Sequence, residues 1–280
     1  MKIRFWGTRG SIPVPGKETM VFGGNTTCLE ITLESGKKVI IDAGTGIRSL
    51  GDKLIESQNT HEIYLLFTHI HWDHVLGFPF FNPVYYPSFK IKIDGFPTCM
   101  KGLKVIFDAK MGDGFFPVNF NDLKANIQYL DQLRYGSLYI DGVAIDKIIL
   151  QHPQSGFGFR LREKGQTVVF ITDNELRDES DSIGFDNYAR FADNADILIH
   201  DAQYLPEEIS FRKGWGHSDY ESALKLANKS QVGKLFLFHH DPARNDQQML
   251  ELEQNCKKLL KGNKGLIIEA AKEGEEVSTV

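Results

Sequence analysis

The chain has 280 residues, a formal net charge of −5, and a composition in which 41% of the residues are hydrophobic and 25% are charged. This composition is too apolar for an intrinsically disordered protein. The acidic balance argues against a protein that grips nucleic acid by its net charge, although a local basic patch would escape that argument. No apolar run approaches the roughly 20 residues of a membrane span.

The N-terminus and the cysteines predict the compartment. Met1–Gly7 reads as a first strand and has neither the apolar core nor the cleavage site of a signal peptide. Cys28, Cys99 and Cys256 are too far apart in the sequence to suggest a disulfide framework or a cysteine zinc site. We therefore expect a cytoplasmic protein.

The first third of the chain is predicted to be mainly β-structure. Its alternating and apolar runs indicate the strands Lys2–Trp6, Thr27–Leu33, Lys38–Ile41 and Ile63–Phe67, with a short helix over Ile47–Ile55. The middle segment, Val75–Gly142, is less regular and rich in Phe, Tyr, Pro and Gly. No element is assigned to it with bounds.

Strand patterns return after the middle segment, with helices between or after them. The predicted strands are Ala144–Leu150, Gly158–Arg162, Thr167–Thr172, Ala195–His200, Lys234–Phe238 and Gly265–Ala270, and the predicted helices are Ser218–Ser230 and Asn245–Leu260. Ser218 and Glu221 match a capping box at the start of the first of these helices. No linker or repeat divides the chain, so we expect one α+β domain over residues 1–280.

The strongest local feature is the segment Phe67–His74, which follows a buried strand. It holds His69, His71, Asp73 and His74 within six positions. Burying that many polar groups without partners would cost several kcal/mol each, and a metal ion supplies the partner. Imidazole nitrogen and carboxylate oxygen together suit Zn²⁺, and also Mn²⁺ or Fe²⁺.

Three more ligand-type residues follow apolar strands in the same way. They are His152, Asp173 and His239. If these strands share one sheet edge, seven ligands converge as two sets with one shared carboxylate. Such a set predicts a site for two divalent metal ions.

At this point the sequence resembles a known family. His69-x-His71-x-Asp73-His74 is similar to the ligand motif of the metallo-β-lactamase superfamily. Ala195–His239, which contains Gly216-His217-Ser218 and ends a strand at His239, resembles the C-terminal half of tRNase Z. Gly7–Pro13 and Gly24–Cys28 are similar to the opening of that branch. The resemblance implies a four-layer αβ/βα sandwich.

The resemblance also implies roles for single residues. His69, His71 and His152 would hold the first metal ion, Asp73, His74 and His239 would hold the second, and Asp173 would bridge them. His239 is preferred to His240 because it matches the family position, and because adjacent residues in extended chain point to opposite faces. Asp42, after the Val39–Ile41 strand, would orient a ligand histidine.

The predicted catalytic residues are Asp73, His217 and Asp201. His217 precedes the helix start, where it could give a proton to a leaving oxygen. In the related enzymes its partner is a glutamate, whereas this chain has the shorter Asp201.

We therefore predict a phosphodiesterase that uses a hydroxide bridging two metal ions. A carboxylic-ester or lactone hydrolase of the same fold is the alternative, and a non-enzymatic metal-binding module is a third. A glutamate stands in place of His71 in flavodiiron reductases, so electron transfer is disfavoured.

The spacing of the ligands bears on the size of the substrate. tRNase Z carries a long arm between the positions of His152 and Asp173, and here the interval is filled by two predicted strands and a turn. We therefore expect the substrate to be a small phosphodiester, either a cyclic nucleotide or a cyclic phosphate. We expect neither a membrane nor a nucleic acid as a partner. A homodimer and the alternative function of a tRNase Z-like RNA endonuclease stay open. Aromatic residues of the middle segment could stack a base or merely cover the sheet: Phe78, Phe80, Phe81, Tyr85, Tyr86, Phe115 and Phe116.

Overall fold

The computed structural model describes residues 1–57, 61–112, 114, 116–176, 182–260 and 265–279. Within them the strands form two seven-stranded sheets with the orders β14-β1-β2-β3-β4-β5-β6 and β13-β12-β11-β10-β9-β8-β7. The first sheet comprises β1 (Lys2–Gly7), β2 (Cys28–Thr32), β3 (Lys38–Ile41), β4 (Glu62–Phe67), β5 (Lys90–Gly95), β6 (Asn126–Tyr129) and β14 (Glu276–Ser278). The second comprises β7 (Leu138–Ile140), β8 (Val143–Ile149), β9 (Phe157–Glu163), β10 (Gln166–Ile171), β11 (Ile197–Asp201), β12 (Lys234–Phe238) and β13 (Ile267–Ala270).

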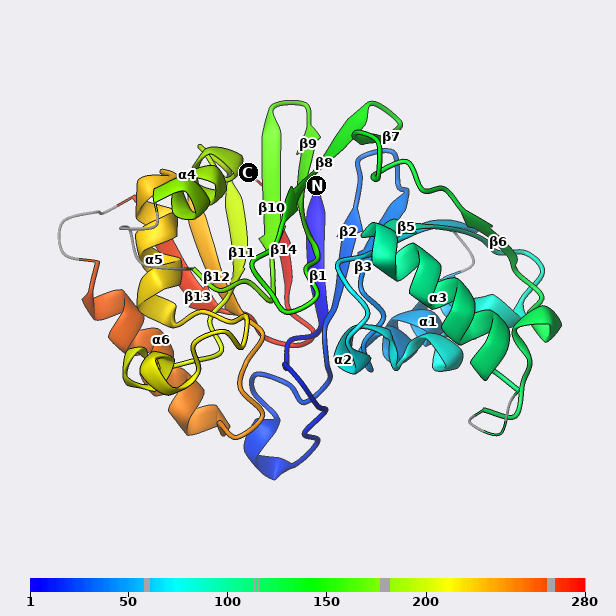
Figure 1. The fold of residues 1–280 in the computed structure, drawn as a ribbon, viewed down its shortest axis with the longest axis horizontal. Coiled ribbons are helices and arrows are strands. Elements are labelled where there is room, and N and C mark those ends of the chain that lie inside the picture. The colour runs from blue at the N-terminus through cyan, green and yellow to red at the C-terminus, as the bar shows by residue number, and fades with distance from the viewer. Residues whose placement is uncertain (58–60, 113, 115, 177–181, 261–264, 280) are drawn as a thin grey trace.

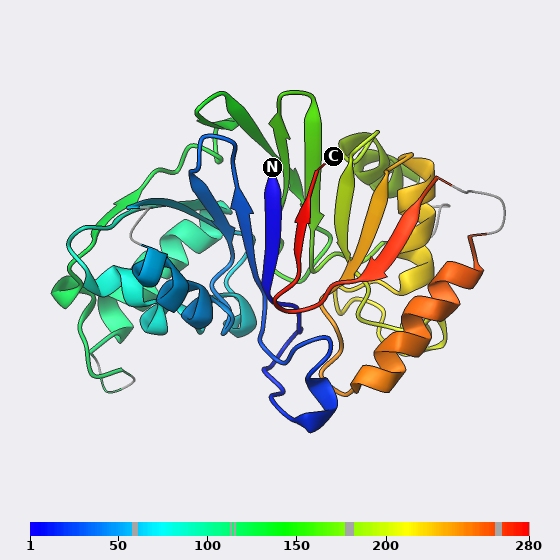
Figure 2. The ribbon, with the colours of Figure 1, turned by 180° about the vertical axis from the view of Figure 1, so that it is seen from behind.

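Helices lie on the outer face of each sheet (Figures 1 and 2). The α-helices are α1 (Ile47–Ser57), α2 (Trp72–Val75), α3 (Pro97–Lys110), α4 (Ser182–Phe191), α5 (Tyr220–Lys229) and α6 (Asp246–Lys258). Short 3-10 turns cover Lys17–Thr19, Phe78–Phe80, Asn82–Tyr85, Phe120–Asp122 and Pro206–Phe211. Helices α1 to α3 cover the first sheet and α4 to α6 the second, so the molecule has the predicted αβ/βα sandwich.

Three apolar cores hold the four layers together. The central core lies between the sheets, where the Phe5 ring packs 5.0 Å from Phe236 and 6.0 Å from Phe238. Each outer core lies between a sheet and its helices. Helix α1, for example, buries Ile47, Leu50 and Leu54, whose spacing puts them on one helical face. The burial of these apolar helix faces against the sheets holds in place the strands that lead to the site.

The direction of the strands brings their carboxyl ends to one edge. β3 and β4 run parallel, as do β10, β11 and β12. β8 runs antiparallel to β9, which runs antiparallel to β10, so β8 and β10 also end on the same side. Parallel strands that are buried on both faces are continuously apolar, as β4 and β12 are, and the polar residues directly after them lie at the shared edge.

The structure differs from the sequence-based expectation in several elements. The middle segment contains β5, α3 and β6 in regular order, and β14 closes the first sheet beside β1 through antiparallel pairing. The cap of α5 is Asp219, whose side chain accepts from the backbone N–H groups of Glu221 and Ser222. Ser218 is not the cap because its hydroxyl donates to the carbonyl of Asn174.

No helix in the part of the chain that the structure describes is both long enough and apolar enough to cross a bilayer.

Candidate metal centre

Six strands deliver the polar residues of the site. The loop after β4 carries His69 and His71, and continues into α2 with Asp73 and His74. The other strand ends supply one residue each: Asp42 after β3, His152 after β8, Asp173 after β10, Asp201 at the end of β11 and His239 after β12. Both sheets therefore contribute to one cluster of histidines and aspartates.

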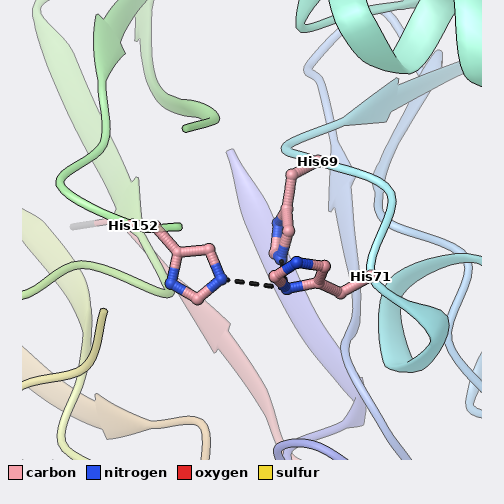
Figure 3. Close-up of side chains that lie close together, drawn as sticks. All are labelled: His69, His71 and His152. Carbon is pink, nitrogen blue, oxygen red and sulfur yellow. Dashed lines mark hydrogen bonds between the residues drawn. The ribbon is translucent and has the colours of Figure 1, made fainter. Parts of the chain in front are cut away.

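The first donor group consists of His69, His71 and His152, whose donor atoms lie within 4.8 Å of one another. Figure 3 shows the three rings converging from two loops. Nδ1 of His71 lies 3.1 Å from Nε2 of His69 and 3.0 Å from Nε2 of His152. Zinc bound by nitrogen at ~2.0–2.1 Å in tetrahedral geometry separates its ligands by about 3.3 Å, so this spacing suits one divalent ion.

The second donor group consists of Asp73, His74, Asp173 and His239, and all four are buried. Oδ2 of Asp73 lies 3.3 Å from Nε2 of His74 and 3.2 Å from Nε2 of His239. Nε2 of His74 is buried and has no hydrogen-bond partner among the described residues. A buried ring nitrogen that makes no hydrogen bond and faces two carboxylates is placed as a metal ligand would be, so the donor set fits a divalent cation.

Asp173 lies between the two groups. Its Oδ1 is 3.3 Å from Nε2 of both His74 and His239. Its Oδ2 is 3.6 Å from Nε2 of His69 and 3.8 Å from Nε2 of His152. One carboxylate oxygen therefore faces each donor group, which is the arrangement that a bridging carboxylate requires.

Protein groups hold the second ring nitrogen of each histidine. Nδ1 of His74 donates to Asp42 at 2.8 Å, Nδ1 of His152 to the carbonyl of Gly216 at 2.9 Å, and Nδ1 of His239 to Oε1 of Gln203 at 3.0 Å. With Nδ1 protonated, Nε2 keeps a lone pair aimed into the site. His71 has the reverse arrangement, because its Nε2 lies 3.2 Å from Oε1 of Gln154 and its Nδ1 faces the donor group.

Backbone strain is concentrated at the same strand ends. Asp42, Asp173 and His239 have φ angles of 63°, 52° and 57°, in the left-handed region that is unfavourable for residues other than glycine. The chain turns directly after β3, β10 and β12, and each of these three residues contributes its side chain to the site. Gly10 packs so closely on His239 that a Cβ there would lie 2.4 Å from Nδ1 of the ring.

Burial and charge set the protonation states of the cluster. Burial lowers the pKa of His69 well below its usual range and also lowers the pKa of His152, which keeps both imidazoles neutral. Burial opposes ionisation of Asp173, but the charges of His239 and His74 outweigh it and hold the pKa of that carboxyl well below its ordinary value. Burial alone would lower the pKa of His74, but the carboxylates of Asp73, Asp173 and Asp42 outweigh burial and raise it well above its ordinary value. Neutral imidazoles and ionised carboxylates are the forms that bind metals, so a metal ion in the second donor group would displace the proton of His74.

His217 and Asp201 form a buried pair beside the donor groups. Nδ1 of His217 donates to Oδ2 of Asp201 at 2.6 Å, and Oδ1 of Asp201 accepts from the backbone N–H groups of Ser218 and Gln203. The ring of His217 stacks on His239 at 4.9 Å and meets His152 edge-on at 5.1 Å. Both Asp201 oxygens are thus engaged, so this aspartate is better suited to hold His217 than to bind a metal.

The two adjacent histidines after β12 have different surroundings. His239 faces Asp73 and Asp173, whereas Nε2 of His240 donates to the carbonyl of Ala271 at 2.8 Å. Burial lowers the pKa of His240 to about 3, so this ring is a neutral core group. The structure therefore places only His239 in the donor group.

Several functional contacts were not anticipated from the sequence. Gln203, Gln154 and Thr68 bond to ring nitrogens of the cluster, and no motif distinguishes them from ordinary loop residues. The aromatic residues of the middle segment mostly pack elsewhere. Phe78 and Phe81 are fully buried in the core with α1, Phe80 and Tyr86 are exposed, and Phe115 lies outside the described residues.

Comparison with known proteins identifies the family. The sequence profile of the beta-lactamase superfamily domain matches residues 37–240, a segment that contains the whole donor set. The chain belongs to this superfamily. It is a metal-dependent hydrolase of the metallo-β-lactamase fold, as the motif His69-x-His71-x-Asp73-His74 suggested.

Similar proteins include a tRNase Z and several structures of the same fold. Ribonuclease Z of Picrophilus torridus is 23% identical over 285 residues, which cover 89% of this chain and 88% of that protein. The metallo-beta-lactamase fold protein YhfI from Bacillus subtilis has a TM-score of 0.72 at 18% identity, with 99% and 98% of the two chains covered. A diphosphatase of the PhnP family has a TM-score of 0.66 at 14% identity, with 99% of this chain and 97% of that chain covered. The short form of human tRNase Z has a TM-score of 0.65 at 21% identity, with 100% of both chains covered.

Proposed function

We propose that this superfamily member is a dinuclear phosphodiesterase that hydrolyses a small phosphodiester, either a cyclic nucleotide or another cyclic phosphate. The observation that carries the proposal is the position of Asp173, which presents one oxygen to each donor group. Two divalent ions held there, zinc or else manganese or iron, would neutralise the phosphodiester anion and supply hydroxide near neutral pH.

In this proposal the chain's own residues orient the reactants and move the proton. Asp73 fixes the second donor group from the start of α2, and Ser11 donates its backbone N–H to the same carboxylate at 2.8 Å. His217 holds a proton on the side of the cluster opposite the attacking group and gives it to the leaving oxygen. Asp201 keeps Nδ1 of His217 protonated, which leaves Nε2 as the atom that faces the substrate.

The proton on His217 persists at neutral pH. Burial alone would lower the pKa of this imidazole, but the Asp201 carboxylate and its hydrogen bond outweigh burial and raise the pKa of His217 to about 9. A general acid has to be protonated at the working pH, and the hydrogen bond from His217 to Asp201 favours the protonated form. The role of His217 rests on this contact and on its ring packing against His239 and His152.

The interval between His152 and Asp173 supports a small substrate. It contains the β9–β10 hairpin, whose strands pair from Gln166↔Glu163 to Phe170↔Phe159 within the second sheet. No part of this interval projects as an arm that could clamp a folded RNA. Because both sheets contribute ligands to one site, we also propose that residues 1–280 form a single hydrolase domain.

An RNA endonuclease is the second candidate, and the names of the curated relatives favour it. Against it stand the net charge of −5 and the compact hairpin, because RNA affinity comes largely from neutralising phosphates with Lys and Arg. A side-by-side assay on 3′,5′-cyclic AMP, 3′,5′-cyclic GMP and a 3′-extended tRNA precursor separates the two. We expect hydrolysis of a cyclic nucleotide. Correctly placed cleavage of the precursor without cyclic-nucleotide hydrolysis would establish the RNA function instead.

A further inference from the structure

The segment that leads into His217 exposes two large aromatic side chains. It runs from Phe211 to Gly216, and Phe211 is 86% exposed and Trp215 59% exposed. An indole has a large apolar surface, and removing that surface from water stabilises a fold. A tryptophan left in solvent is therefore a candidate for contact with another molecule. Trp215 is two residues from His217, at the border of the site.

A buried carboxylate fixes the backbone on both sides of Trp215. Oε2 of Glu175 accepts from the N–H of Gly214 at 2.8 Å and from the N–H of Gly216 at 3.0 Å. Glu175 is itself only 8% exposed, and its own N–H donates to the carbonyl of Gln151, next to His152. Charge-assisted bonds of this kind are stronger than neutral ones, so a buried carboxylate holds the backbone that carries Trp215.

The same backbone is joined to the donor groups. The carbonyl of Gly216 accepts from Nδ1 of His152 at 2.9 Å. Gly216 has a φ of 85°, and a Cβ there would lie 2.1 Å from Nδ1 of that ring, so no larger residue fits. The backbone next to Trp215 is thus joined to His152 and leads directly into His217.

A cation stands beside the indole. The guanidinium of Arg212 lies 5.4 Å from the ring centre of Trp215 and 4.9 Å from that of Tyr204. Arg212 also lies 3.9 Å from a carboxylate oxygen of Asp241, which restricts its side chain. An exposed indole with an adjacent guanidinium attracts a planar heteroaromatic group that is linked to an anion.

We propose that Trp215 is the stacking platform for the nucleobase of the substrate. The inference rests on the proposed phosphodiesterase function and narrows it, because a simple cyclic phosphate without a base would leave the platform unused. The base lies against the indole while its phosphodiester reaches the donor groups and His217. Glu175 is the positioning residue of the platform and does not touch the substrate.

The test compares two ligands that share a phosphate and a sugar and differ only in the base. Adenosine 5′-monophosphate and ribose 5-phosphate are titrated into the metal-loaded protein by calorimetry. We expect the wild type to bind adenosine 5′-monophosphate more tightly by roughly 10- to 100-fold, the worth of one base stacked on an aromatic ring. Trp215→Ala should remove this difference without changing the affinity for ribose 5-phosphate, and Trp215→Phe should keep most of it.

Two other variants serve as matched controls. Phe211→Ala removes a still more exposed aromatic from the same segment, and Trp72→Ala removes the 67% exposed indole between His71 and Asp73. Neither should change the preference for the base. Because Trp215 is exposed, its truncation should leave the unfolding temperature unchanged, and a folded variant is therefore expected.

The outcomes separate this inference from the proposed function. Three results would contradict the role of Trp215 as a stacking platform. The wild type could bind the two ligands equally, Trp215→Ala could lose affinity for both ligands equally, or only Trp72→Ala could lose the preference for the base. Cleavage of a diester together with equal binding of the two ligands would support the proposed reaction and contradict the stacking role of Trp215. Base-dependent binding without cleavage of any diester would support the stacking role of Trp215 and contradict the proposed reaction. If the protein bound neither ligand, the stacking role would be wrong.

Discussion

The carboxylate of Asp42 accepts a hydrogen bond from Nδ1 of His74 at 2.8 Å, and both residues are fully buried. The same carboxylate accepts from the backbone N–H of Thr68 at 2.8 Å and from its hydroxyl at 2.7 Å. Three donors therefore converge on one ionised acceptor. Asp42 fixes the tautomer of His74 and aims Nε2 at Asp73 and Asp173.

Asp42→Asn should weaken metal binding by roughly 10- to 100-fold, because an amide cannot accept from all three donors without turning its own N–H₂ toward one of them. Competition with a chelator of known affinity measures the change. Asp94→Asn is the matched control, since Asp94 is equally buried and accepts from Gly95, Gln132 and Leu133, none of which belongs to the donor groups. Equal losses of metal affinity in both variants would contradict the role of Asp42.

His239 and His240 offer a comparison between adjacent histidines. We expect two divalent ions per wild-type chain after loading, about one in His239→Ala, and two in His240→Gln, whose amide can still donate to Ala271. Elemental analysis of the dialysed proteins gives the stoichiometry. A single ion in the wild type, or a loss of metal confined to the His240 variant, would refute this assignment.

His217→Ala should retain its metal ions and lose roughly 10²–10⁴ in kcat, the usual contribution of a general acid. Steady-state kinetics on a diester with a poor leaving group, combined with elemental analysis, distinguishes the outcomes. The defect should shrink for a leaving group such as p-nitrophenolate, which departs without a proton. A variant that loses its metals would show His217 to be a ligand, and one with an unchanged rate would show it to be structural.

The His217–Asp201 pair should also make the metal-free protein sensitive to alkali. Since the folded pKa of about 9 exceeds the ordinary value of 6.5, the pair stabilises the fold fully below pH 6.5 and loses this contribution as the pH rises through 9. The loss amounts to at most about 3 kcal/mol. Urea unfolding between pH 6 and 10 measures it, and Asp201→Asn should abolish this pH dependence. A wild type and variant with parallel pH profiles would disprove the coupling.

The positions of the ligand-type residues could be predicted from the sequence because each follows an apolar strand. β4 and β12 are continuously apolar and buried, so the first polar residues after them had to lie at the edge of a sheet. The structure brings together His69, His152, Asp173 and His239, which are far apart in the chain, because their strands end on the same side. The site also depends on the register and the parallel direction of the paired strands, and no local sequence pattern contains this information.

The features that escaped prediction depend on tertiary contacts. β14 has three residues and exists through its pairing with β1 at the other end of the chain. Ser218 and Asp219 are equally good caps by type, and the hydroxyl of Ser218 is engaged by Asn174 and Leu176 only in the folded protein. Glu175 resembles any loop acid until the fold brings the N–H groups of Gly214 and Gly216 to it.

Turnover of a phosphodiester by the metal-loaded protein decides whether the site is a phosphodiesterase. Bis(p-nitrophenyl) phosphate, p-nitrophenyl phosphate and a simple lactone are compared by kcat/KM at pH 7 with zinc and with manganese. We expect the diester to be cleaved fastest, with the monoester and the lactone well behind. A lactone that turns over far faster than any diester would contradict it and make the site a carboxylic-ester hydrolase.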